Sequence, residues 1–294
     1  MASSSPIFRF APSPNGRLHL GHAYSALMNE RLAARFQGDL LLRIEDIDLT
    51  RCRAEFEQGI RDDLAWLGIS FGPEVRRQSL HFDDYRQALG RLEATGLVYP
   101  CFCSRQEIKD LVRRREATTG IPWQRDPDGA PLYLGTCPAL GEAEMRRRRE
   151  AGEPHVLRLA MDRALARLAG ESLSYRLFDE AGGEREIPVD PRRWGDVVLA
   201  RKDVPTSYHL SVVVDDALQG VSHVVRGRDL EAATDIHVLL QHLLRLPTPR
   251  YHFHRLLSDE TGQKLAKSRS SRSLADLRAD GATSEAIRRQ LGFT

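Results

Sequence analysis

The sequence has no apolar run near the ~18 residues that a membrane-spanning helix needs, and residues 1–8 form neither a basic leader nor a signal-peptide core. We therefore expect a cytoplasmic protein with no membrane partner. Four cysteines in 294 residues are too few for a disulfide scaffold. Lys and Arg number 43 against 41 Asp and Glu, so bulk charge predicts no strong attraction for nucleic acid. Any such partner must be recognised locally.

The N-terminal region has the pattern of an α/β protein. Ile7–Phe10 is a short apolar run, and a Pro/Gly loop follows over residues 11–16. An Ala- and Leu-rich stretch then predicts a helix over about residues 20–36. Asp39–Ile44 is again apolar. This order predicts a strand, a loop, a helix and a strand, which is the parallel crossover unit of an α/β sheet.

The composition changes in the middle of the chain. Residues 97–191 contain three of the four cysteines, turn-rich stretches and two arginine runs, Arg113–Arg115 and Arg146–Arg149. We interpret this part as an inserted module between two halves of one catalytic domain, residues 1–96 and 192–294. The second arginine run lies among glutamates, which favours a solvated helix there over an RNA contact and leaves the RNA contact as the alternative.

Strand-like runs resume after the inserted module. They cover Val197–Ala200, Tyr208–Val214 and Ser222–Val225, and a helix-like stretch follows from about Ala232 to Leu244. We expect the second half of the parallel sheet in this region.

Two short segments carry candidate phosphate-binding groups. His19 and His22 flank Gly21 at the junction of the Pro/Gly loop and the first predicted helix, where backbone N–H groups and the helix dipole favour an anion. Lys264 and Lys267 could place two ammonium groups on a triphosphate. Taken singly, the histidines could be partly exposed polar residues and the lysines a solvated basic loop.

Together, several separated motifs resemble the glutamyl branch of class I aminoacyl-tRNA synthetases. The resemblance rests on Arg9–Pro14, His19–His22, Leu42–Asp48 and Lys264–Ser268, in the order of that family. It implies a Rossmann-type parallel sheet that carries a "HIGH" and a "KMSKS" signature. Leu20, Leu265 and Ala266 depart from these signatures, but both histidines and both lysines remain. We expect altered loop closure and not loss of activity.

The resemblance implies that the protein forms glutamyl-adenylate from L-glutamate and ATP with Mg²⁺. His19, His22, Lys264 and Lys267 would be the catalytic groups, and Gly21 would join them in binding ATP. Such chemistry needs no protein nucleophile, because positioning and cations accelerate it.

Charge also suggests a glutamate pocket. A substrate with two carboxylates and one ammonium calls for cationic forks and an acid, and Arg9, Arg226 and Glu45 match these needs. Which arginine binds the side-chain carboxylate stays open at this stage. The resemblance adds Ala11, Ser13 and Tyr208 to this pocket. Glu45 could instead pair with Arg43, and Tyr208 could be a half-buried strand aromatic. We assign the neighbouring Asp46 and Asp48 to the scaffold.

The cysteines of the inserted module lie at Cys101, Cys103 and Cys137. By spacing alone they could equally be buried free thiols or three ligands of a zinc site. The resemblance implies one structural Zn²⁺ held by these cysteines and the phenol of Tyr133, with His155 as an alternative fourth ligand.

Within the glutamyl branch, the chain is similar to the shortened family of glutamyl-queuosine tRNA(Asp) synthetases, because it stops soon after the second signature without an anticodon-binding domain. The resemblance implies activation of glutamate without tRNA and its transfer to queuosine at the wobble position of tRNA(Asp). A shortened glutamyl-tRNA synthetase acting in trans and a non-catalytic RNA-binding module are the alternatives. A plain phosphotransferase is least favoured, since no Gly-x-x-x-x-Gly-Lys loop is present. We expect a monomer.

Overall fold

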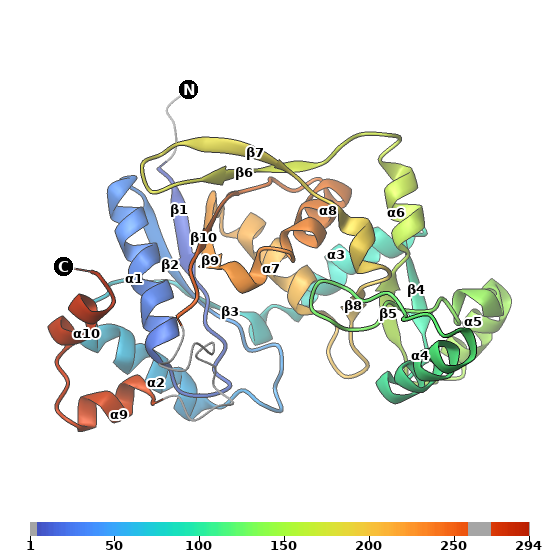
Figure 1. The fold of residues 1–294 in the computed structure, drawn as a ribbon, viewed down its shortest axis with the longest axis horizontal. Coiled ribbons are helices and arrows are strands. Elements are labelled where there is room, and N and C mark those ends of the chain that lie inside the picture. The colour runs from blue at the N-terminus through green and yellow to red at the C-terminus, as the bar shows by residue number, and fades with distance from the viewer. Residues whose placement is uncertain (1–4, 258–271, 294) are drawn as a thin grey trace.

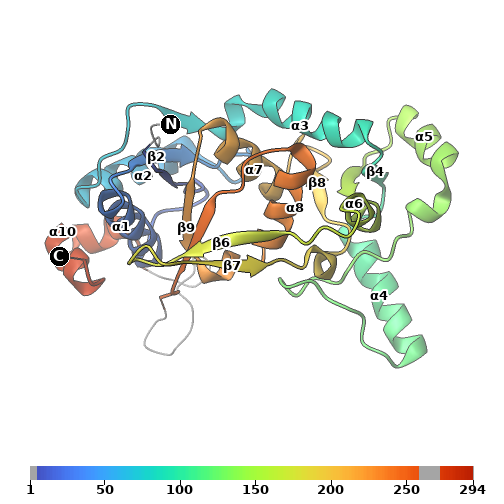
Figure 2. The same ribbon diagram turned by 90° about the horizontal axis from the view of Figure 1, so that it is seen from above.

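The computed structural model describes residues 5–257 and 272–293. The molecule is elongated, and both views place helices α4 and α5 at the end opposite helices α1 and α10 (Figure 1 and Figure 2). The strands are β1 (Ile7–Phe10), β2 (Asp39–Ile44), β3 (Val75–Arg77), β4 (Val98–Cys101), β5 (Val156–Leu159), β6 (Ser174–Phe178), β7 (Glu184–Pro188), β8 (Val198–Ala200), β9 (His223–Gly227) and β10 (Arg250–His254).

Helices alternate with these strands along most of the chain. The α-helices are α1 (Leu20–Arg35), α2 (Ala54–Trp66), α3 (Phe82–Ala94), α4 (Arg105–Thr119), α5 (Glu142–Glu150), α6 (Met161–Arg167), α7 (Tyr208–Leu218), α8 (Thr234–Leu244), α9 (Leu274–Ala279) and α10 (Ser284–Gln290). Short 3₁₀ helices are η1 (Gln78–Leu80), η2 (Pro138–Leu140), η3 (Pro191–Trp194) and η4 (Arg228–Leu230). Within the described ranges, no helix combines the length and the apolar character that a membrane span requires.

The central sheet confirms the predicted parallel crossover unit. Strands β1, β2 and β3 are parallel, and β9, β10 and β6 form a second parallel set with β7 antiparallel at its edge. The two sets meet where the N–H of Ser222 donates to the carbonyl of Ile7 at 3.0 Å. Strand order therefore reverses between β1 and β9. In open α/β sheets, ligands bind at the carboxyl ends of the strands at such a reversal.

The predicted strand at residues 197–200 exists, but its expected place is wrong. Strand β8 pairs antiparallel with β5, which pairs with β4, so it belongs to a separate sheet and not to the second half of the parallel sheet. The division into residues 1–96, 97–191 and 192–294 stays a prediction. Strand pairing crosses the boundary between residues 191 and 192, because β6 and β7 precede this boundary and pair in one sheet with β9 and β10, which follow it.

The predicted strand over Tyr208–Val214 is also wrong, since these residues begin helix α7. Three consecutive valines favour a strand by propensity, but a short apolar run buried on all sides does not reveal its period. Residues 210–216 are all buried, and α7 packs against helices α3 and α8. Tertiary burial has overridden local preference here.

A buried ion network joins helix α7 to the central sheet. Asp216 accepts hydrogen bonds from Arg9 at 3.0 Å and from Arg43 at 2.7 Å. Asp215 accepts one from Arg76 at 2.6 Å. Burial disfavours the charge on Arg43, but the nearby carboxylates outweigh it and raise its pKa. The acids that follow the valine run thus hold arginines from β1, β2 and β3 in place.

Candidate functional site

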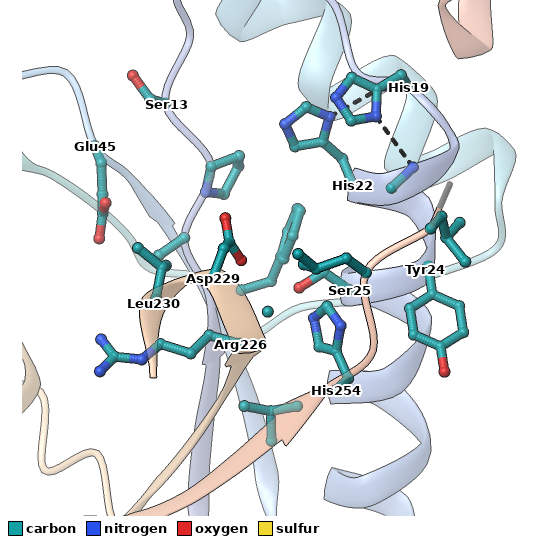
Figure 3. Close-up of a pocket in the computed structure, with 18 of the residues that line it drawn as sticks. Ser13, His19, His22, Tyr24, Ser25, Glu45, Arg226, Asp229, Leu230 and His254 are labelled. Carbon is teal, nitrogen blue, oxygen red and sulfur yellow. Dashed lines mark hydrogen bonds between the residues drawn. The ribbon is translucent and has the colours of Figure 1, made fainter. Parts of the chain in front are cut away.

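A cavity of about 590 Å³ opens at the strand-order reversal, beside the carboxyl ends of β1 and β9 (Figure 3). Every predicted glutamate- or ATP-binding residue within the described ranges lines this cavity, although these residues come from distant parts of the chain. They are Arg9, Ala11, Ser13, His19, Gly21, His22, Glu45, Tyr208 and Arg226. Ser13, Glu45 and Arg226 lie on one side, and the two histidines lie at the start of α1 on the other.

The two histidines cap helix α1 reciprocally. The N–H of Gly21 donates to Nδ1 of His19 at 3.1 Å, and the N–H of His19 donates to Nδ1 of His22 at 3.2 Å. The ring centroids are 3.9 Å apart. Because backbone N–H groups only donate, both Nδ1 atoms must be unprotonated, and each neutral ring then carries its proton on Nε2. Both rings are thus fixed at the N-terminus of α1, where backbone N–H groups and the helix dipole favour an anion.

Lys264 and Lys267 lie outside the described residues, but the chain on either side of their segment reaches this cavity. Leu256 and Leu257 line it. After the segment, Ser273 forms an isolated bridge with His19. The described residues that flank the segment with the predicted lysines therefore lie beside the cavity and beside His19.

Glu45 lies on the opposite side of the cavity, next to the buried ion network. Its carboxylate is 3.3 Å from the guanidinium of Arg43. Glu45 therefore forms the alternative salt bridge with Arg43 and also lines the cavity. Burial raises the pKa of Glu45, although Arg43 and Arg9 act in the opposite direction. A ligand cation beside this carboxylate would favour its ionised form.

Arg226 differs from Arg9 in the charge of its partners. Arg9 is paired with the carboxylate of Asp216. Arg226 donates instead to Nδ1 of His237 at 3.0 Å and to the hydroxyl of Thr234 at 2.8 Å, both neutral acceptors. Its Nε is buried without a hydrogen-bond partner. The cavity therefore contains a guanidinium whose charge the described protein residues do not neutralise.

Sequence reasoning missed the cavity residues at and just beyond the carboxyl ends of β9 and β10. Gly227, Asp229 and His254 belong to this group, and Ser25 lines the cavity from α1. The available signal was the alternation of aromatic residues and histidine in Arg250–His254. A parallel strand there implies that its carboxyl end lies beside that of β9.

A second cavity of about 440 Å³ adjoins the first, with Ser13, Glu45 and Tyr208 common to both. Four arginines line it, from two loops, from the start of helix α4 and from strand β5: Arg51, Arg201, Arg105 and Arg158. Asp48 also lines it and accepts hydrogen bonds from Thr50, Arg51 and Arg201. The hydrogen bond from Thr50 leads the effects that lower the pKa of Asp48. Asp46 instead accepts hydrogen bonds from Arg77 at the end of β3 and from Ser79 in η1.

The three predicted thiols converge. The sulfur atoms of Cys101, Cys103 and Cys137 all lie within 4.8 Å of one another. The phenol oxygen of Tyr133 is 3.5 Å from Cys103 Sγ. A hydrogen bond from Cys101 lowers the pKa of the Cys137 thiol, although burial acts in the opposite direction. His155 is outside this cluster, with Nδ1 bonded to the carbonyl of residue 153.

Residues 7–293 match the family described as "tRNA synthetases class I (E and Q), catalytic domain". A glutamyl-Q tRNA(Asp) synthetase of Rhodobacter capsulatus is 46% identical, over 98% of this chain and 100% of its own. A glutamate--tRNA ligase 2 of Nitrosococcus oceani is 38% identical over 95% of this chain, which spans only 57% of that relative. A glutamate-tRNA synthetase structure from Elizabethkingia anophelis matches with a TM-score of 0.78 at 25% identity, over 98% of this chain and 61% of its own. The chain therefore belongs to the class I tRNA synthetases of the E and Q type and is a class I aminoacyl-tRNA synthetase-like ligase.

Proposed function

We propose that this ligase activates L-glutamate with ATP in the absence of RNA and then transfers the glutamyl group to queuosine at the wobble position of tRNA(Asp). The observation that carries the proposal is the single cavity in which Arg226 and Glu45 lie opposite the capped start of α1 (Figure 3). Relatives named glutamyl-Q tRNA(Asp) synthetase, 46% and 38% identical over nearly all of this chain, support the choice of acceptor.

The side of the cavity that holds Arg9, Arg226 and Glu45 matches the charges of L-glutamate. Arg226 offers an unneutralised guanidinium for one carboxylate, and Arg9, held by Asp216, lines the same cavity and would bind the other. Glu45 would accept the ammonium group, which would offset the burial that raises the pKa of this carboxyl. Ala11, Ser13 and Tyr208 complete the wall.

Adenylation then needs only alignment and positive charge. An oxygen of the glutamate α-carboxylate attacks the α-phosphorus of ATP. The bond between this phosphorus and the oxygen that bridges it to the β-phosphorus breaks, and pyrophosphate leaves. His19 and His22 would donate through Nε2 to the phosphates, and Lys264 and Lys267 are proposed to add positive charge. Mg²⁺ would accompany the phosphates as part of the nucleotide substrate.

The second cavity provides a place for the acceptor nucleoside. A hydroxyl oxygen of queuosine attacks the acyl carbon, the bond from that carbon to the phosphate oxygen breaks, and AMP leaves with the hydroxyl proton on its phosphate. The cavity adjoins Tyr208 and Glu45, so an acceptor in it would lie next to the acyl group. Its arginines suit the neighbouring RNA phosphates, because phosphate contacts dominate RNA affinity.

We propose that Cys101, Cys103, Cys137 and Tyr133 hold one structural zinc ion. Ligands about 2.3 Å from zinc in a tetrahedron lie about 3.8 Å apart, and Cys103 Sγ is 3.6 Å from Cys137 Sγ. The N–H of Phe102 donates to Cys137 Sγ at 3.3 Å, as suits a thiolate ligand. When bound, the ion would cross-link the end of β4 to the segment that precedes η2.

Two assays test the proposal with the 294-residue chain. ATP–pyrophosphate exchange that depends on L-glutamate and needs no RNA is expected, and background exchange would favour a non-catalytic RNA-binding protein. Mass spectrometry should then show one glutamyl group on the queuosine nucleoside of tRNA(Asp). Charging of the 3′ end of tRNA(Glu) instead would support the second candidate function, a shortened glutamyl-tRNA synthetase that acts in trans. The likeness to relatives named glutamate--tRNA ligase favours this candidate. The predicted monomeric state stays a prediction.

A further inference from the structure

Arg226 is a buried guanidinium held only by neutral groups. Arg226 is 5% exposed, and its guanidinium forms no ion pair with any residue in the ranges 5–257 and 272–293. The rings of Tyr251 and Phe253 lie 5.3 Å and 5.7 Å from its central carbon. An isolated buried charge is costly unless something compensates it. A bound carboxylate would supply that compensation.

The first turn of helix α8 directs this guanidinium. Thr234 and His237, one turn apart, accept from its two terminal nitrogens. The acid between them, Asp235, is bonded to Arg193 at 2.6 Å instead. The carboxylate of this turn is therefore paired with another arginine, while a neutral ring is paired with Arg226.

A hydrogen-bond chain fixes the charge state of that ring. A guanidinium only donates, so Nδ1 of His237 must accept and the proton lies on Nε2. This Nε2 is 3.3 Å from Nδ1 of His209 and donates to it. Burial and the positive charge of Arg226 lower the pKa of both histidines, that of His209 to about 4. Both rings are thus neutral near pH 7.

We propose that His237 is a specificity-determining positioning residue for the substrate side chain. As a neutral acceptor it orients Arg226 and leaves the guanidinium charge to bind the side-chain carboxylate of the amino acid. An acid at this position would orient Arg226 equally well but would neutralise it, and the preference for glutamate over glutamine would fall. This inference rests on the proposed glutamate activation and assigns a further residue to it.

The test compares His237→Asn with His237→Asp, which have the same shape and differ in charge. The Asn oxygen can accept the hydrogen bond that Nδ1 accepts in the wild type. We expect His237→Asn to keep a near wild-type KM for glutamate in ATP–pyrophosphate exchange. We expect His237→Asp to raise that KM roughly tenfold or more, to leave the KM for ATP unchanged and to admit glutamine.

Equal KM values for glutamate in the two variants would overturn the inference. If His237→Asp does not fold, Thr234→Asp against Thr234→Asn tests the same charge at the other guanidinium nitrogen. Calorimetry of L-glutamate binding to the wild-type protein distinguishes a failure of the proposed activation from a failure of the proposed role of His237. Glutamate binding by wild-type protein without exchange would overturn the proposed activation alone, while a wild-type protein that does not bind glutamate would overturn the inference as well.

Discussion

The imidazole of His19 occupies the space that a side chain on residue 21 would enter. An ideal Cβ on Gly21 would lie 2.9 Å from Cε1 and 3.1 Å from Nδ1 of His19. The backbone of Gly21 is helical and does not itself require glycine. The glycine between the two histidines is therefore required by the ring that caps the helix.

Gly21→Ala is expected to push the His19 ring out of its capping position. The loss of one cap destabilises the protein by about 1 kcal/mol. Misplacement of a phosphate-binding group should lower kcat/KM for ATP in pyrophosphate exchange by roughly tenfold to a hundredfold. Steady-state exchange kinetics and thermal unfolding of the purified variant measure the two effects.

The matched control is Gly90→Ala in helix α3, where a new Cβ would meet no atom within 4 Å. Alanine in an open helical position is more stable than glycine by roughly 0.5–1 kcal/mol. This control should keep full exchange activity and unfold at a slightly higher temperature. Equal activity in both alanine variants would show that the ring does not depend on the glycine.

Asp216→Asn should weaken the junction between α7 and the central sheet. The carboxylate accepts from Arg9 and Arg43, and removing a partner from a buried charge pair costs about 3 kcal/mol or more of unfolding free energy. Burial opposes ionisation of Asp216, but the two arginines outweigh it and lower its pKa. Its stabilisation is thus complete above the ordinary carboxyl pKa and is lost only as the pH falls through the lower folded value.

Urea denaturation at pH 6 and pH 8 should therefore give the same difference between wild type and Asp216→Asn. Asp83→Asn is the control, because Asp83 is 96% exposed and pairs with Arg86 on the surface. A surface pair adds little to stability. A loss at Asp216 no larger than that at Asp83 would contradict the structural role of the buried network.

The N-terminal half of the catalytic fold could be predicted from the sequence better than the C-terminal half. Ile7–Phe10 and Asp39–Ile44 are strands with exactly the predicted bounds, because their apolar runs are bounded by proline, glycine and acids. The strand prediction for the α7 segment is wrong. Its valines are buried on every side of the helix, so they form a short apolar run, as the residues of a buried strand would. His237 was not found, since nothing in its helical pattern shows that Arg226 reaches it.

Stability should fall on acidification between about pH 6.5 and pH 4 through the buried histidines. Burial lowers the pKa of His223 to about 4, so in this range the unfolded chain binds a proton that the folded chain does not. Between pH 7 and pH 5 this single group removes about 2 kcal/mol. His223→Phe keeps the ring that stacks on Phe8 at 4.8 Å and removes the titration.

The free energy of unfolding of His223→Phe should therefore depend less steeply on pH than that of the wild type. Chemical denaturation at pH 5, 6 and 7 provides the comparison. His81→Phe serves as the control, because it is the same substitution at a histidine whose side chain is 37% exposed. Parallel pH profiles for wild type and His223→Phe would refute the assignment of this titration to His223.

Cys103→Ser is expected to abolish binding of the proposed zinc ion, because the cluster needs all three thiols to approach a tetrahedral site. Cys52→Ser, outside the cluster, should keep one zinc per chain as measured by mass spectrometry of the metal. Tyr133→Phe tests the fourth ligand and His155→Ala tests its alternative. Because His155 lies outside the cluster, only Tyr133→Phe should weaken zinc retention against a chelator. The opposite result would move the fourth ligand to His155 and require the strand-end segment that carries it to shift on binding the metal.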